Sequence, residues 1–149
     1  MEEEIYEDEK IYDAVRKFIA TFYKDNPFVQ YLKIDVTSIE RDHVRLDADI
    51  VRIHTNVYGI AHGGVTMTMA DTAMGAVCLA HNKRVVTLDC NVSFIKAIPQ
   101  GMHVHAVGRV LHDGSRTMVC ESEVRDEDGT LYAKAHGTFF VLRKFLAEE

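Results

Sequence analysis

The sequence predicts an α+β domain in which an antiparallel sheet of about six strands wraps around one long central helix. Its periodic segments run in the order helix, two strands, long helix, four strands, and consecutive strands without intervening helices are typical of antiparallel sheets. The long helical segment is rich in small residues, which let a helix approach a sheet closely: Ala70, Ala73, Gly75, Ala76 and Ala80. At 149 residues, the chain (1–149) is expected to form one domain that begins with a helix.

The first half of the chain contains two helices and two strands by these criteria. Apolar residues at 11, 15, 18, 19 and 22 predict one face of an N-terminal helix, which Asn26-Pro27 ends. Two strands are expected on either side of a turn at Glu40–Asp42, because Val44, Leu46, Ala48 and Ile50 alternate with polar residues. A glycine-containing loop then leads into the central helix, expected at about 65–81.

Strand patterns fill the second half. In residues 86–94 every even position is apolar and every odd position is polar, which predicts one buried face. Three further strands follow the turn at 99–101, separated by the turn-like segments HDGSR and DEDG.

The composition excludes several classes of protein. A net charge of −6 argues against a nucleic-acid partner. Asp71 interrupts the longest apolar run, so no membrane span is expected, and the glutamates after Met1 do not resemble a secretion signal. We therefore expect a cytoplasmic protein.

No metal site is expected from the cysteines and histidines. The three cysteines are Cys78, Cys90 and Cys120. They lack a CxxC spacing and are expected to be buried thiols. His103 and His105 share a strand face and His112 follows, but no third ligand with metal-site spacing accompanies them.

One carboxylate, Asp71, lies on a mostly apolar helical face, where an ionised acid is costly without partners. Gly63 and Gly64 stand at the expected start of the same helix, whose free N–H groups can bind an anion or an oxyanion. Asp71 follows Gly63 by eight residues, or about 12 Å along the axis, too far to act on one carbonyl. A second, antiparallel copy of the helix would bring each Asp71 towards the other copy's Gly63.

These residues carry a family resemblance. The pattern Asn56-x-x-Gly59-x-x-His62-Gly63-Gly64 followed by Ala70-Asp71-x-Ala73 resembles the hotdog-fold thioesterases of the phenylacetate-degradation (PaaI-like) type. The resemblance covers roughly residues 30 to 142, continuing through Val86–Phe94 and the Asp113-Gly114-Ser115-Arg116 turn.

The resemblance implies a hotdog fold and hydrolysis of an acyl- or aroyl-coenzyme A thioester, with no separate cofactor. It also implies homodimers with shared active sites, expected to pair into tetramers. Asp71 would be the general base or nucleophile, Gly63 N–H would polarise the carbonyl, and Asn56 would help to hold the carbonyl or the water. Thr87 would orient the water or the acid, and His62 would position the loop.

The resemblance implies that the turn with Ser115 and Arg116 contacts the phosphate or pantetheine region of coenzyme A. Lys96, a basic residue after the strand of Thr87, is another candidate for the phosphates, and Gly64 is expected to contact the substrate. The two basic residues are also compatible with ordinary surface charges. One branch of hotdog thioesterases has a hydroxyl residue one turn after the acid, and Gly75 at that position departs from it.

Plainer interpretations remain for the central residues. Asn56 can form an Asx-turn, His62 can be a structural hydrogen-bonding residue, and Thr87 is a common residue on the polar face of a strand. Strict alternation places Asp89 on the same strand face as Thr87, and we expect it to have a surface or interface role. The N-terminal helix covers a sheet or subunit surface, or shapes the acyl pocket.

Two other functions remain open. A non-catalytic hotdog protein would bind acyl-coenzyme A without hydrolysing it, although the presence of Asp71 argues against this. A hotdog dehydratase would act on hydroxyacyl thioesters, but it pairs a histidine with an acid in a different arrangement.

Overall fold

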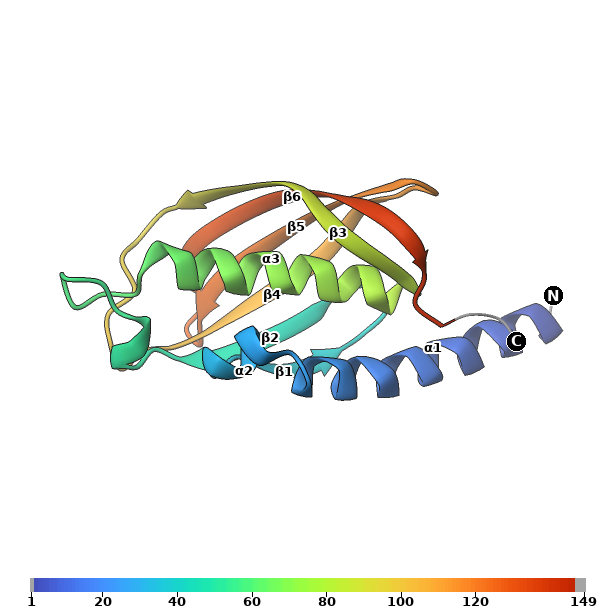
Figure 1. Ribbon diagram of the computed structural model, residues 1–149, viewed down its shortest axis with the longest axis horizontal. Coiled ribbons are helices and arrows are strands. Elements are labelled where there is room, and N and C mark those ends of the chain that lie inside the picture. Colours follow the sequence, from blue (N-terminus) through green and yellow to red (C-terminus); the bar gives the residue numbers. More distant parts are fainter. Residues whose placement is uncertain (1, 147–149) are drawn as a thin grey trace.

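Six antiparallel strands form one sheet that wraps around a central helix, α3 (Figure 1). The computed structural model describes residues 2–146. The strands are β1 (Asp35–Ile39), β2 (Val44–Asp49), β3 (Lys83–Phe94), β4 (His103–Asp113), β5 (Thr117–Asp126) and β6 (Leu131–Lys144). They lie in the order β1-β2-β4-β5-β6-β3, which leaves β1 and β3 at the two edges. The predicted α+β architecture and the element order are confirmed.

The helices are α1 (Glu2–Lys24), α2 (Pro27–Tyr31), the 3-10 turn η1 (Arg52–His54) and α3 (Gly63–Ala80). The break predicted at Asn26-Pro27 separates α1 from α2. The Asn26 side chain accepts a hydrogen bond from Val29 N at 3.3 Å and so caps α2. Within residues 2–146, no helix combines the length and apolar character needed to cross a membrane.

The buried face of α1 differs in part from the predicted one. Val15, Ile19 and Tyr23 are buried, whereas Phe18 and Phe22 are 57% and 41% exposed. Phe18 and Phe22 instead pack edge-to-face on Phe145, with ring centroids 6.4 and 5.6 Å apart. The spacing of apolar residues could not separate the core from this smaller aromatic cluster, because Phe145 comes from the other end of the chain.

The central helix packs very closely on the sheet at Gly108 of β4. A Cβ atom at this position would lie 2.2 Å from the Ala73 carbonyl oxygen, which belongs to the α3 backbone. Only glycine allows this approach without moving a main chain. The small residues of α3 are buried against the same surface, with Ala70, Ala73 and Ala76 fully covered.

Strand β3 contains one extra residue, and this overturns the simple alternation predicted for it. Thr87 pairs with Phe139 of β6 and Asp89 pairs with Thr138, so Leu88 is the additional residue of a β-bulge. Paired residues share a face of the sheet, and Phe139 is buried on the inner face. Thr87 therefore faces α3 and Asp89 faces outward, so the prediction that they share a face is wrong.

The cysteine prediction holds for two of the three thiols. Cys78 of α3 and Cys120 of β5 are buried with their sulfur atoms 3.5 Å apart, and both are free thiols. Cys90 is only half-buried, because it lies on the edge strand.

We expect Gly108→Ala to lower the free energy of unfolding by about 1–3 kcal/mol, because the new methyl group must push α3 away from the sheet. Gly75→Ala in α3 is the matched control, since its Cβ would lie 3.9 Å from the Phe139 ring, in ordinary contact. This control should be neutral or stabilising, because alanine favours a helix. Denaturant unfolding measures the stability of both variants. A free energy of unfolding that is unchanged in Gly108→Ala would contradict the close approach of the two backbones.

Candidate active site

Asp71 and Thr87 form a hydrogen-bonded pair between α3 and the edge strand β3. Thr87 Oγ1 donates to Asp71 Oδ1 at 2.8 Å, and the carboxylate is half-buried. The β3 bulge directs Thr87 inward, so the pair depends on the backbone irregularity that sequence alternation concealed. The two residues that the resemblance linked functionally are thus in direct contact.

The surroundings of Asp71 include groups from two other segments. Burial raises the pKa of the Cys90 thiol on β3, and the negative charge of Asp71 adds to the effect. Burial also raises the pKa of Tyr23 at the end of α1, with smaller contributions from Cys78 and Asp71. Both α1 and β3 therefore contribute to the environment of the acid.

At the N-terminus of α3, one backbone N–H group donates to a side chain and another has no acceptor in the described residues. His62 is the N-cap, and its Nδ1 accepts a hydrogen bond from Gly64 N at 2.8 Å. The proton of a neutral His62 is consequently on Nε2. Gly63 is the first helical residue, and no group within residues 2–146 accepts its N–H. Gly63 therefore offers an available donor at the positive end of the helix dipole.

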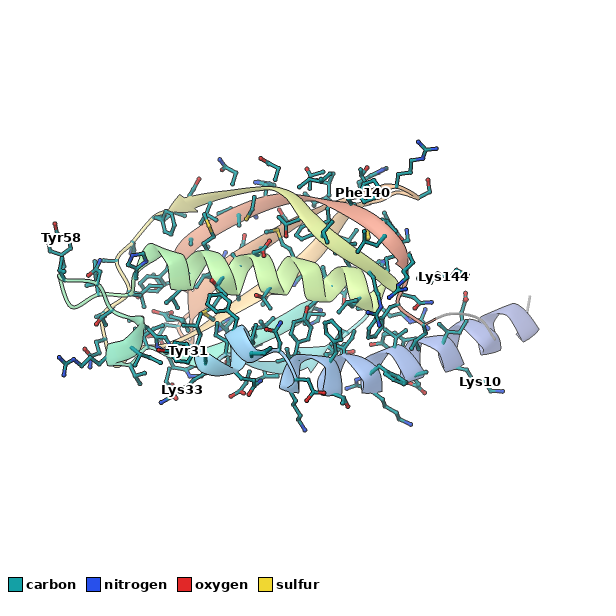
Figure 2. All side chains as sticks on the ribbon, in the orientation of Figure 1. Lys10, Tyr31, Lys33, Tyr58, Phe140 and Lys144 are labelled. Atoms are coloured by element: carbon teal, nitrogen blue, oxygen red, sulfur yellow. The ribbon has the colours of Figure 1, made fainter. Side chains whose placement is uncertain are left out.

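Asn56 holds the loop before α3 in an Asx-turn. Its Oδ1 accepts hydrogen bonds from Tyr58 N at 2.9 Å and from Ile60 N at 3.4 Å. In the part of the chain that the structure describes, no group accepts a hydrogen bond from the Asn56 amide nitrogen. Tyr58 stands at the exposed tip of this loop (Figure 2). Asn56 thus forms the Asx-turn that was its structural interpretation, and its NH₂ group is still able to donate a hydrogen bond.

A cavity of about 310 Å³ lies beside the start of α3. Gly63, Lys96 and Phe94 are among the residues that line it, and Asp71 is not. Sequence reasoning missed Phe94, whose ring would lie 3.3 Å from a Cβ atom at position 63. Its position at the end of the alternating strand was the available signal, but the pattern suggested a core residue.

Ser115 and Arg116 lie far from this cavity. They occupy the exposed β4–β5 turn, which contacts the chain just after the C-terminal end of α3. There, His81 Nδ1 lies 3.2 Å from Asp113 Oδ2, and Lys83 donates to the Gly114 carbonyl at 2.9 Å. This turn and Gly63 are at opposite ends of α3, about 25 Å apart along the helix (Figure 1).

One chain therefore brings the predicted site residues together in three groups. Asp71 lies with Thr87, Gly63 lies with Lys96, and the β4–β5 turn is separate. The chemistry of the groups is complementary, because a carboxylate can activate water and a helix N-terminus can stabilise an oxyanion.

Comparison with known proteins identifies the family. A model of the thioesterase superfamily matches residues 58–133, just over half of the chain. A candidate esterase of Saccharolobus solfataricus is 29% identical and covers 88% of this chain and 94% of its own length. Acyl-coenzyme A thioesterase PaaI of Escherichia coli is 24% identical over 77% of this chain and 82% of its own length.

Solved structures agree with this result. A Streptococcus mutans protein, solved with bound acetyl-CoA, is 33% identical and covers 74% of this chain and 90% of that chain, with a TM-score of 0.72. The structure of E. coli PaaI has a TM-score of 0.79 at 22% identity, covers 83% of this chain and 90% of that chain, and shows the same fold. The chain belongs to the thioesterase superfamily and is a PaaI-like hotdog thioester hydrolase.

Proposed function

We propose that this protein hydrolyses acyl- or aroyl-coenzyme A thioesters to a free acid and coenzyme A. The observation that carries the proposal is the hydrogen bond between Thr87 and Asp71, together with the available N–H of Gly63 at the start of the same helix. Membership of the thioesterase superfamily supports the reaction, and the E. coli relative named as an acyl-coenzyme A thioesterase supports the substrate class.

The chemistry assigns a role to each group. Asp71 accepts a proton from water as the water oxygen attacks the thioester carbonyl carbon, or its carboxylate attacks that carbon directly. Gly63 N–H donates to the carbonyl oxygen as negative charge develops on it. The carbon–sulfur bond then breaks, and the thiolate of coenzyme A leaves and takes up a proton. When Asp71 is the nucleophile, water must then hydrolyse the acyl–Asp71 anhydride, which releases the free acid and restores the carboxylate.

Three polar residues support this arrangement. Thr87 fixes the orientation of the Asp71 carboxylate through their 2.8 Å hydrogen bond. The NH₂ group of Asn56 donates to the substrate carbonyl or to the water while its oxygen holds the loop. His62 caps the helix through Gly64 and thereby keeps the neighbouring Gly63 N–H directed outward.

The complete site is proposed to form between two copies of the chain. Gly63 lines a cavity that Asp71 does not reach, and eight residues of helix separate the two. With two α3 helices side by side and antiparallel, the partner's acid lies next to this chain's helix start. The edge position of β3 is compatible with pairing of the two sheets.

The same antiparallel arrangement would bring Ser115 and Arg116, which are far from the cavity within one chain, close to the cavity of the partner. The partner's β4–β5 turn would approach the N-terminal end of α3, so Ser115 and Arg116 of one copy and Lys96 of the other flank one cavity. Cationic side chains at this place suit the phosphates of coenzyme A. The S. mutans protein solved with acetyl-CoA supports this ligand class.

Pairing of dimers into tetramers is proposed on the basis of an exposed apolar patch. The patch lies on the neighbouring strands β3 and β6, and its members are Val86, Leu88, Phe140 and Leu142. Phe140 and Val86 are cross-strand partners next to the inward-facing Phe139, so both lie on the outer face of the sheet. A patch of this kind is more typical of an interface than of a water-exposed surface.

We expect Asp71→Asn to lose at least 10²-fold in kcat on every acyl-coenzyme A that the protein hydrolyses, because an amide is neither a base nor a nucleophile. Thiol release from a panel of short, long and aromatic acyl-coenzyme A esters measures the activity. Near-full activity of Asp71→Asn would contradict the role of the acid. No activity of the unaltered protein on any ester would favour the binding-only function, and water elimination from a hydroxyacyl ester would favour the dehydratase.

A pair of substitutions separates the Gly63 N–H from the space around it. Gly63→Pro removes the N–H at the first helical position, where proline is tolerated, and His62 has the extended ψ of 137° that suits a residue before proline. We expect a loss of about 10²–10³-fold in kcat. Gly63→Ala adds a Cβ atom but keeps the N–H and should lose much less. Equal losses in both variants would show that crowding against Phe94, not hydrogen bonding, governs the effect.

A further inference from the structure

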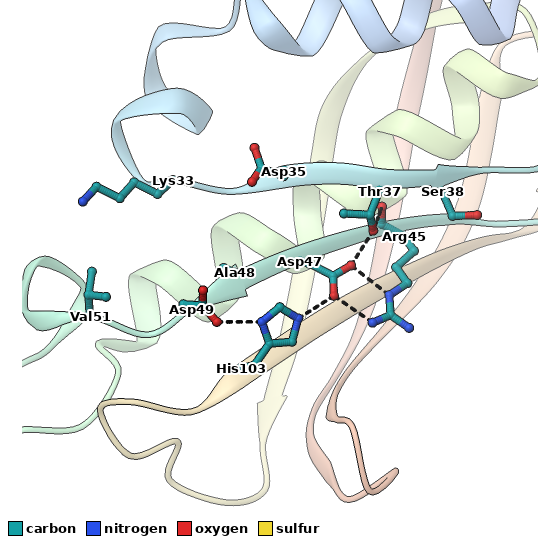
Figure 3. Close-up of a pocket in the computed structure, with 10 residues that line it drawn as sticks. All are labelled: Lys33, Asp35, Thr37, Ser38, Arg45, Asp47, Ala48, Asp49, Val51 and His103. Atoms are coloured by element: carbon teal, nitrogen blue, oxygen red, sulfur yellow. Dashed lines mark hydrogen bonds and ion pairs between the residues drawn. The ribbon is translucent and has the colours of Figure 1, made fainter.

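A cluster of histidines and carboxylates lies on the outer face of the sheet, on the side away from α3. Asp47 of β2 faces its cross-strand partner His105 of β4, and Asp49 faces His103 in the same way. Figure 3 shows His103 between the two aspartates. Glu127, in the turn after β5, reaches the same point: its Oε1 lies 3.4 Å from His105 Nδ1.

We propose that His103, His105, Asp47 and Glu127 form a binding site for a divalent transition-metal ion, with zinc(II) as the best fit. The ligand atoms of Asp47, His105 and Glu127 all lie within 4.8 Å of one another. His103 Nε2 supplies a fourth atom, 2.7 Å from Asp47 Oδ2 and 3.7 Å from Glu127 Oε1. Ligand atoms of tetrahedral zinc lie about 2.0–2.2 Å from the ion and therefore about 3.3–3.6 Å from one another.

A buried, unpaired nitrogen of His105 is a second and independent observation in favour of a bound ion. Its Nδ1 is buried and has no hydrogen-bond partner in the described part of the chain, although it is directed at Glu127. In its neutral form the imidazole can offer the lone pair of this nitrogen to a metal ion. A buried nitrogen without a partner is costly, and metal coordination would satisfy it.

Arg45 competes with the proposed ion. Its Nη2 lies 2.7 Å from Asp47 Oδ2 and 2.9 Å from Glu127 Oε1, so the guanidinium now neutralises both carboxylates. The ion would displace Nη2, while Nε of Arg45 could keep its 2.8 Å hydrogen bond to Asp47 Oδ1. The cluster contains three carboxylates, two paired with Arg45 (Asp47 and Glu127) and one with His103 (Asp49), so the charge balance still favours an added cation.

The second ring nitrogen of His103 is already held in place. His103 Nδ1 lies 2.7 Å from Asp49 Oδ1, and this contact can orient the ring while Nε2 binds the ion.

The test is titration of the full-length, metal-free protein with Zn²⁺ by calorimetry and with Co²⁺ by visible absorption. We expect one ion per chain and the intense absorption of tetrahedral Co²⁺. Glu127→Gln changes an exposed side chain and should weaken binding at least tenfold, as should His105→Ala. Arg45→Met removes the competitor and should strengthen binding at least tenfold.

His136→Ala is the matched control, because His136 is an exposed histidine of the same face beside Glu121. It should leave the affinity unchanged. If Glu127→Gln and Arg45→Met bind Zn²⁺ like the unaltered protein, or if His136→Ala weakens binding as much as His105→Ala, the cluster is an ion-pair network and the proposal is wrong. Thioester hydrolysis does not enter these readouts, so they stand apart from the proposed function.

Discussion

The close packing of α3 on the sheet determines where the polar groups of the proposed site lie. At Gly108 the strand and helix backbones approach so closely that no side chain fits between them. This contact fixes the axis of α3, and with it the position of Asp71 relative to β3. Thr87 can then reach the carboxylate only because the Leu88 bulge directs it inward. The position of the Asp71 carboxylate thus depends on one steric constraint in the core, the contact at Gly108.

The N-terminus of α3 shows how two adjacent glycines come to have different functions. The His62 ring occupies the N–H of Gly64, and this bond leaves Gly63 as the available donor. A cap by a histidine also orders the backbone without placing a negative charge beside the position where an oxyanion would form. Asn56 contributes from the preceding loop, where one side-chain atom stabilises the turn and the other is able to donate. Local stability and proposed catalysis therefore use different atoms of the same residues.

Sequence reasoning was accurate where a pattern is local and wrong where distant segments decide the outcome. Period-two alternation predicted the existence of β3 and the inward positions after Leu88, but the inserted residue reverses the faces before Leu88, and alternation alone does not reveal a bulge. The spacing of Asp71 and Gly63 is the basis for proposing a site divided between two chains, because helix geometry is nearly invariant. The sequence placed His103 and His105 on one strand face, but it could not show that Asp47 and Glu127 lie beside them, because these carboxylates come from β2 and the β5–β6 turn, far away in sequence.

The central claim is that each active site combines Asp71 of one chain with Gly63 of another, and mixing two inactive variants tests it most directly. In a hybrid dimer of Asp71→Asn and Gly63→Pro chains, one site carries both changes and the other carries neither. With equal, random mixing, about half of the dimers are hybrids, so about a quarter of the unaltered activity should return. If each site belonged to a single chain, every site would keep one lesion. A mixture no more active than its separate components would contradict the claim.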